Sequence, residues 1–143
     1  MHFEETIAFE PVSLKRHRHV MGGTRTYDPS SKDKQLFVEA IGNKDAFETP
    51  MTHPIVCTLY FYCKRPKSHF GTKRGQPYLR PDAPKYNRCN KDLDNMVKFV
   101  LDALNGKLYV DDCQIVEIVC KKLYVVNPLD SGSIYARFTE IVD

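Results

Sequence analysis

The chain has 143 residues, of which 42% are hydrophobic and 27% charged, with a formal net charge of +3, and this balance suits one domain with a sizeable core. The longest apolar run covers residues 55–63, far short of the roughly 18 apolar residues that a membrane span requires, and the acidic start MHFEETIAFE lacks the pattern of a secretory signal. Five cysteines without a CxxC pair argue against a disulfide framework and a compact zinc site, so we expect an intracellular domain that is neither secreted nor membrane-bound.

Three elements are predicted in the first half of the chain. Residues 3–12 alternate in part between apolar and polar side chains and are expected to form a strand. A polar stretch with a Gly22–Gly23 turn follows, and apolar residues at helical spacing then predict a helix over 31–42. Residues 54–63 are rich in β-branched and aromatic side chains, which favours a central strand.

Residues 64–91 differ in composition from the rest of the chain. They contain four prolines, two glycines and nine Lys or Arg residues against the single Asp82, which predicts a long basic loop without a regular element. The segment 61–91 has a net charge of +8, and the following segment 92–143 has a net charge of −4. This arrangement indicates a polyanion held beside carboxylates; the alternative is a basic loop that only aids solubility.

The second half is expected to contain one helix and two strands. Residues 92–106 (DLDNMVKFVLDALNG) place apolar side chains on one helical face and end in Asn-Gly, which predicts an amphipathic helix. Residues 114–126 and 133–142 are expected to be strands joined by a hairpin-like turn, NPLDSG. The order of elements predicts an α+β fold over residues 1–143 as a single domain, with helices packed on a small mixed sheet.

Asp92 and Asp94 flank the first apolar residue of the predicted helix. Inside a helix, side chains two residues apart point about 200° apart, but in an extended segment they lie on one side. With Asp92 at or just before the cap and Asp94 in the first turn, the two carboxylates could converge on a cation. The alternative is an ordinary capping role, because Asp at a helix start accepts N–H groups and complements the macrodipole.

Further charged residues line the same helix and the turn after it. Lys98 and Asp102 follow Asp94 at intervals of four, which predicts an i,i+4 ladder with Asp102 paired to Lys98. Asp111 and Asp112 fall in the turn after the helix, where the chain can return to its vicinity. Oxygen ligands without a nearby His or Cys pattern favour Mg²⁺ or Mn²⁺, and carboxylates beside a basic loop suit metal-assisted phosphodiester hydrolysis.

Residues 91–118 (KDLDNMVKFVLDALNGKLYVDDCQIVEI) closely resemble the signature of RusA-type Holliday-junction resolvases, D-x-D-N-x-x-K followed by L/F-D-A-L and D-D-x-Q-I/V. The rest of the chain agrees in outline, and the long basic loop departs from compact members. The resemblance implies an intertwined or two-fold homodimer without an organic cofactor. It also implies a Mg²⁺-dependent endonuclease of DNA recombination and repair, with Mn²⁺ as a substitute, which cuts four-way junctions by paired symmetric nicks.

The resemblance also implies roles for individual residues. The catalytic, metal-binding aspartates of the family match Asp92, Asp94 and Asp112, and its essential lysine matches Lys98. The auxiliary residues are then Asp111, Lys91 and Asn95. The cations expected to contact DNA are Lys15, Arg16, Arg18, Arg25, Lys73, Arg74, Arg80, Lys85 and Arg88.

Three questions stay open at the level of the sequence. Tyr78 and Tyr86 could stack on unpaired bases or could only anchor the basic loop. A structure-selective nuclease for flaps or forks would use the same carboxylates and cations as a junction resolvase. A non-catalytic DNA-binding module would use the acidic residues only as caps and salt bridges.

Overall fold

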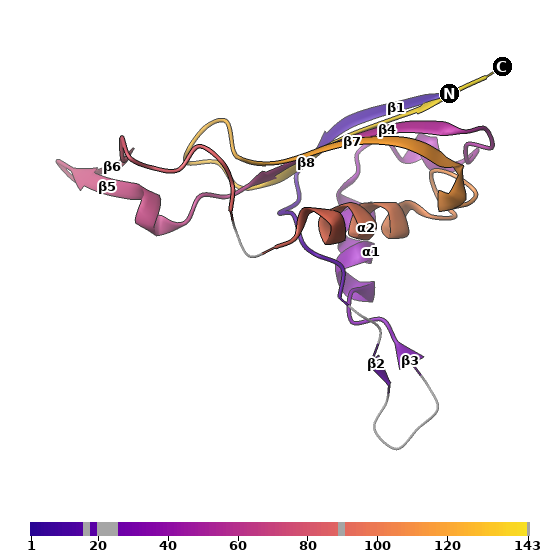
Figure 1. The fold of residues 1–143 in the computed structure, drawn as a ribbon, viewed down its shortest axis with the longest axis horizontal. Coiled ribbons are helices and arrows are strands. Elements are labelled where there is room, and N and C mark those ends of the chain that lie inside the picture. Colours follow the sequence, from indigo (N-terminus) through magenta and orange to yellow (C-terminus); the bar gives the residue numbers. More distant parts are fainter. Residues whose placement is uncertain (16–17, 20–25, 89–90, 143) are drawn as a thin grey trace.

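A computed structural model describes residues 1–15, 18–19, 26–88 and 91–142. Its centre is a four-stranded sheet in the order β1-β8-β4-β7 (Figure 1). The strands are β1 (His2–Ile7), β4 (Ile55–Cys63), β7 (Ile115–Tyr124) and β8 (Ser133–Glu140). Strand β8 is antiparallel to β1 and to β4, whereas β7 is parallel to β4, so the prediction of a mixed sheet is confirmed.

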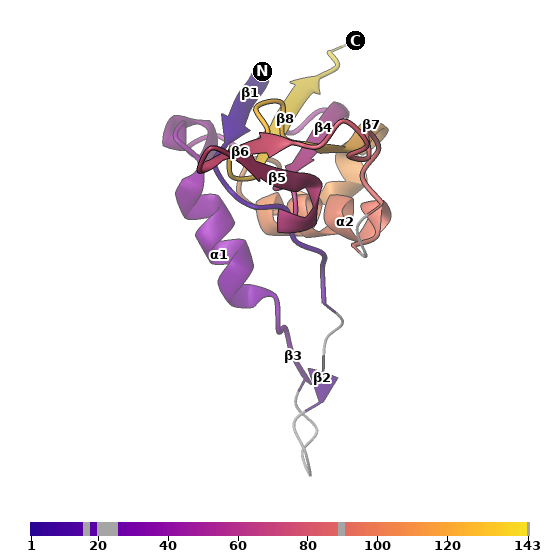
Figure 2. The same cartoon turned by 90° about the vertical axis from the view of Figure 1, so that its left-hand side faces the viewer.

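Two helices, α1 (Ser31–Ala40) and α2 (Leu93–Leu104), lie on one side of the sheet (Figures 1 and 2). The amphipathic helix predicted over 92–106 is confirmed as α2, which turns its apolar stripe inward so that Phe99 and Val100 are fully buried. It ends just before Gly106, whose φ of 77° is a conformation that favours glycine. Apolar side chains of the sheet and the two helices together form one core, and the helices leave the opposite face of the sheet uncovered.

Strands β7 and β8 do not form the hairpin that the linker NPLDSG suggested. They lie on opposite sides of β4, and the chain passes the end of β4, where the N–H of Val125 donates to the carbonyl of Cys63 at 3.0 Å. Strand β4 is central because most of its side chains are buried, and an edge position would expose them to water. The linker is long enough for either arrangement, so its composition could not decide between them.

Residues 64–91 are not a loop without regular structure, as their composition suggested. They contain a short 3₁₀ turn and a hairpin that projects from the core (Figure 1): Lys67–His69, β5 (Phe70–Lys73) and β6 (Gln76–Leu79). Arg74 and Gly75 connect the strands with φ values of 54° and 76°, the geometry of a two-residue hairpin turn. Pro77 is accommodated because each strand of this two-stranded sheet has one free edge, toward which a missing N–H can point.

A second ribbon, β2 (Arg18–His19) with β3 (Thr26–Tyr27), extends from the core ahead of α1 (Figure 2). The expected Gly22–Gly23 turn lies outside the described residues. Helix α1 and strand β4 agree with their predicted ranges to within two residues at each end, whereas β1 is shorter than the predicted strand. Two further 3₁₀ turns cover Lys44–Phe47 and Asp112–Gln114. In the described parts of the chain, no helix has the length and apolar character needed to cross a membrane.

Candidate active site

The start of α2 presents two exposed carboxylates. Asp92 is the N-cap, with extended backbone angles (φ −74°, ψ 133°), and its side chain makes no capping hydrogen bond. Its carbonyl accepts the N–H of Met96 at 3.1 Å. Asp94 lies in the first turn and is 72% exposed, with its Oδ2 4.0 Å from Nζ of Lys98. The predicted positions of both aspartates relative to the cap are confirmed, and capping does not occupy the Asp92 carboxylate.

Lys91 and Asn95 attach the start of α2 to residues 11–14 and to strand β7. Nζ of Lys91 donates to the carbonyl of Pro11 at 2.8 Å, and the carbonyl of Lys91 accepts Nζ of Lys122 at 2.9 Å. The carbonyl of Asn95 accepts the N–H of Leu14 at 3.1 Å. Both residues therefore help to set the position of Asp92 and Asp94.

Asp111 and Asp112 lie beyond the other end of α2. Oδ1 of Asp111 accepts the N–H of Cys113 at 3.4 Å, and the N–H of Asp111 donates to Oε1 of Gln114 at 2.8 Å. The N–H of Cys113 lowers the pKa of Asp111. Burial raises the pKa of Asp112, and its hydrogen bond to Asp111 and the charges of Asp111 and Asp102 act in the same direction. A bound cation would oppose this effect by stabilising the ionised form of Asp112.

Helix α2 separates the two carboxylate pairs. It has 12 residues and is therefore about 18 Å long, with Asp92 before its first turn and Asp111 after its last (Figure 1). Across the residues that the structure describes, no three His, Cys, Asp or Glu side chains lie close enough together to hold a metal. The carboxylates suit Mg²⁺ or Mn²⁺ chemically, but a single chain does not place Asp112 beside Asp92 and Asp94.

Asp102 does not pair with Lys98, contrary to the prediction from its spacing. Its carboxylate binds Nζ of Lys34 in α1, which also binds the carboxylate of Asp28. Burial lowers the pKa of Lys34, but the hydrogen bonds to Asp102 and Asp28 outweigh burial and raise it. The pair joins α1 to α2 across 68 residues of sequence, so no local pattern could have revealed it.

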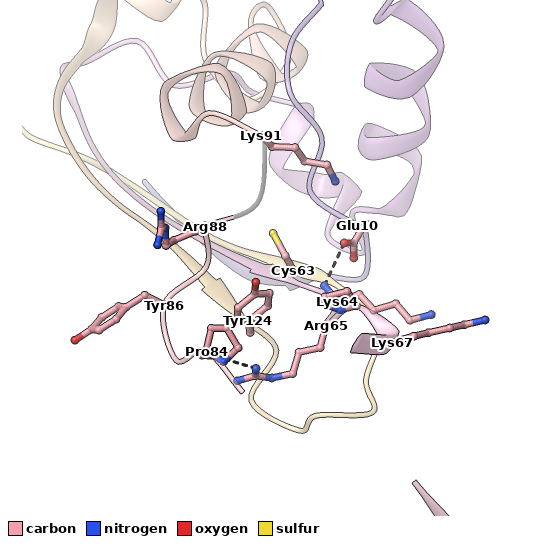
Figure 3. Close-up of a pocket in the computed structure, with 11 residues that line it drawn as sticks. Glu10, Cys63, Lys64, Arg65, Lys67, Pro84, Tyr86, Arg88, Lys91 and Tyr124 are labelled. Carbon is pink, nitrogen blue, oxygen red and sulfur yellow. Dashed lines mark hydrogen bonds between the residues drawn. The ribbon is translucent and has the colours of Figure 1, made fainter. Parts of the chain in front are cut away.

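A cationic pocket adjoins the start of α2 (Figure 3). It has a volume of about 760 Å³ and is formed by the ends of β4 and β7 and by segments on both sides of the β5–β6 hairpin. Its lining includes five cations, two tyrosines and one carboxylate: Lys64, Arg65, Lys67, Arg88, Lys91, Tyr86, Tyr124 and Glu10. Lys91, which lines the pocket, directly precedes Asp92 in the chain.

Arg65 holds the wall of this pocket together. Its Nη1 donates to the carbonyl of Pro84 at 2.9 Å, and its guanidinium lies 4.6 Å from the centre of the Tyr124 ring. The same Nη1 is 3.2 Å from Nδ1 of His69, and burial together with the Arg65 charge lowers the pKa of His69. Tyr86 is by contrast 81% exposed and points outward at the rim (Figure 3). The pocket therefore combines a fixed cationic wall with an exposed aromatic ring.

The cations predicted to contact DNA are spread over the two ribbons and the pocket. Lys73 and Arg74 lie at the tip of the β5–β6 hairpin, and Nε of Arg80 donates to the carbonyl of Phe70 at 3.0 Å. Arg88 lines the pocket, and Lys85 is exposed next to it.

The remaining predicted cations belong to the N-terminal segment. Lys15 is exposed ahead of the β2–β3 ribbon, Arg18 begins β2, and Arg16 and Arg25 lie outside the described residues. Sequence reasoning did not select Lys64, Arg65 and Lys67, although the net charge of +8 over 61–91 includes all three. The sequence signal that the three cations share is their position directly after the buried central strand β4.

Comparison with known proteins gives two matches. Residues 8–129 match the model of the family described as endodeoxyribonuclease RusA. The chain is also 32% identical over 131 residues to the uncharacterized protein YqaN of Bacillus subtilis (strain 168), an alignment that covers 86% of this chain and 88% of YqaN. The family match includes the start of α2, the cationic pocket and the Asp111–Asp112 turn.

Proposed function

The chain belongs to the RusA family of endodeoxyribonucleases, and on this premise we propose that it resolves four-way Holliday junctions in DNA recombination and repair. In this proposal a homodimer makes paired, symmetric nicks in opposing strands, with Mg²⁺ as the metal and Mn²⁺ as a substitute. A four-way junction has two-fold symmetry, and a two-fold dimer presents two sites to opposing strands.

The observation that carries the proposal is the cationic pocket beside the carboxylates of Asp92 and Asp94. DNA presents a dense row of phosphates, and Lys or Arg side chains that neutralise them supply much of the binding free energy. A strand bound along the pocket would pass Lys91 and reach the start of α2. The positive charge would therefore direct a phosphodiester toward the two aspartates.

The residues at the start of α2 have distinct roles in this reaction. Asp92 and Asp94 would hold the metal with a third carboxylate, for which the family signature assigns Asp112. A bound Mg²⁺ supplies an activated water and offsets charge on the phosphate. Lys98, which lies 4.0 Å from Asp94, would stabilise the charge that develops on the phosphate oxygens. Lys91 and Asn95 would position the helix start through the hydrogen bonds described above.

A cleavage assay on defined substrates tests this function. The purified protein is incubated in Mg²⁺ with a synthetic four-way junction, a flap, a fork and a linear duplex, with EDTA as the control. We expect symmetric nicks in the junction that EDTA abolishes. Preferential cutting of the flap or fork would instead identify a structure-selective nuclease. Binding without cleavage in Mg²⁺ or Mn²⁺ would indicate a DNA-binding module.

A further inference from the structure

We propose that the cationic pocket binds one nucleotide that has left the base stack of DNA, with its base against an apolar floor and the neighbouring phosphates at the cations of the rim. The inference rests on the function proposed above for the choice of DNA as the ligand, and deepens it by stating which feature of branched DNA the pocket takes. Its experiments measure binding without cleavage, so that the two proposals can fail separately.

The floor of the pocket is apolar. It consists of the Cys63 thiol and the rings of Pro66, Pro84 and Tyr124, and Cys63, Pro84 and Tyr124 lie together in the middle of the pocket (Figure 3). A phosphate group loses hydrogen bonds to water beside such a surface and gains none in return. A flat base instead gains free energy when its apolar faces are removed from water. The floor therefore suits a base better than it suits the DNA backbone.

Cations flank this floor on two sides. In Figure 3, the side chains of Lys64 and Lys67 extend from one side of the pocket, and the side chain of Arg88 extends from the other. Lys and Arg side chains bind phosphates and fix the register of a nucleic-acid strand, whatever its sequence. A strand that crosses the pocket would therefore meet cations before and after the nucleotide at its centre.

The pocket has the size of a site for a small organic molecule, and its wall is already in place. Its volume of about 760 Å³ lies within the range of roughly 300–1,000 Å³ that is typical of such sites. Arg65 is held by the carbonyl of Pro84 and by the Tyr124 ring, and the same ring meets the His69 ring edge-on, with 5.1 Å between the ring centres. A base would therefore bind without first ordering this wall, which lowers the entropic cost of binding.

Only a nucleotide outside the stack can place the face of its base on the floor, because a paired base in a duplex presents only its edges in the grooves. Extrusion of a nucleotide costs least where pairing or stacking is already lost, and a branch point interrupts the stacking of its arms. The pocket would therefore favour branched DNA over linear duplex through the lower cost of extrusion. Tyr86 points outward at the rim (Figure 3) and would contact a neighbouring base.

A duplex with a single bulged nucleotide tests the pocket without a junction. Fluorescence anisotropy in EDTA measures binding to this duplex and to the same duplex with an abasic bulge. We expect the wild-type protein to bind the bulge that carries a base about tenfold more tightly, within the usual range for one base–aromatic contact. Tyr124→Leu should remove this difference, and Tyr124→Phe, which retains the ring, should keep it. Lys64→Ala/Lys67→Ala should weaken binding to both duplexes alike, because both carry the same phosphates.

Two results would overturn the base-binding pocket: equal affinity of the wild-type protein for the two bulges, or a difference that survives in Tyr124→Leu. The matched control is Tyr60→Leu, since the Tyr60 ring stacks on Tyr135 within the sheet, and this variant should keep the difference.

A second measurement uses the wild-type protein and covers the case in which Tyr124→Leu does not fold. An iodouracil base in the bulge is irradiated in the complex, and the crosslinked residue is identified by mass spectrometry. A crosslink to Tyr124 is the expected result, and a crosslink to Tyr86 alone would overturn the pocket as the site of the base. A protein that distinguishes the two bulges but cuts no junction would overturn the proposed function alone. A protein that cuts junctions but does not distinguish the bulges would overturn this inference alone.

Discussion

At the scale of the residue, the start of α2 shows what local sequence can and cannot predict. The cap position of Asp92 and the first-turn position of Asp94 follow from the apolar stripe that begins at Leu93, so both could be predicted. The partner of Asp102 could not be predicted, because Asp102 binds Lys34 from another helix and not the nearby Lys98. A spacing of four residues permits an ion pair, but tertiary contacts decide which partner is nearer.

Replacing Asp94 separates a metal-binding role from a helix-dipole role. We expect Asp94→Asn to abolish junction cleavage and to leave junction binding equal or tighter, because it removes a ligand and a negative charge near phosphate. Asp33→Asn is the matched control, since Asp33 also lies in the first turn of a helix. In both variants the free energy of unfolding should fall by a similar amount, about 0.3–1 kcal/mol, because each loses one favourable interaction with the helix dipole. Cleavage at the wild-type rate by Asp94→Asn would show that this carboxylate binds no catalytic metal.

The exposed ring of Tyr86 predicts stacking on an unpaired base at the pocket rim. Truncation to Ala should weaken junction binding by about tenfold, within the usual range for loss of one base–aromatic contact. Tyr78 lies on the β5–β6 hairpin and is less exposed, so Tyr78→Ala serves as the control and should have a smaller effect. Equal losses for the two variants, measured by fluorescence anisotropy, would contradict a specific role of Tyr86.

Glu140 predicts a stability change at acid pH. Its Oε2 accepts the N–H groups of Thr52 and His53 at 3.1 and 3.0 Å. Burial raises the pKa of Glu140, but these hydrogen bonds and the contact with the terminal amine outweigh burial and lower it from the ordinary value of 4.5. A lowered pKa means that ionised Glu140 stabilises the folded state above pH 4.5, and that this stabilisation is lost as the pH falls through the lowered value.

The corresponding variant is Glu140→Gln. It should have a lower free energy of unfolding than the wild type at about pH 7, and the difference should shrink toward about pH 3. Urea titrations over this range measure the difference. A difference that stays constant with pH would show that the charge of Glu140 does not stabilise the fold.

At the scale of the element, helices and the central strand were predictable because their signals are local. The apolar stripe of α2 and the β-rich run of β4 each determine their own burial. The strands with which β7 and β8 pair depend on which strand must be shielded from water on both faces. The sequence of the linker between β7 and β8 does not determine this. The β5–β6 hairpin was not predicted, because the four prolines and nine cations of residues 64–91 favoured a loop. The two-residue turn at Arg74 and Gly75 was too short a signal to favour a hairpin instead.

The projecting hairpin and the pocket segment predict a salt-dependent contact with DNA. The side chains of Lys73 and Lys85 are exposed, whereas Arg74 supplies a positive φ to the hairpin turn and Nε of Arg80 donates to the carbonyl of Phe70. The double variant Lys73→Ala/Lys85→Ala should reduce the slope of log affinity against log salt by up to about 1.8, since each neutralised phosphate contributes about 0.9. Lys32→Ala/Lys107→Ala removes the same charge elsewhere and is the control. An equal change of slope in both double variants would contradict a specific path over the hairpin.

At the scale of the whole molecule, the carboxylates and the cations were predictable as groups, but their arrangement was not. Asp111 and Asp112 were expected in the vicinity of the helix, and the structure places them beyond the end of α2 and just before β7, at the opposite end of the helix from Asp92 and Asp94.

The coupling of the two sites can be measured on a supercoiled plasmid that extrudes a cruciform. A dimer that makes both nicks during the lifetime of one complex converts the plasmid directly to the linear form. The proposed function predicts linear product from the earliest times in Mg²⁺ with the wild-type protein, and an uncut plasmid with the Asp94→Asn variant. Nicked circles that accumulate first with the wild-type protein, or a plasmid that stays supercoiled, would contradict a paired resolvase.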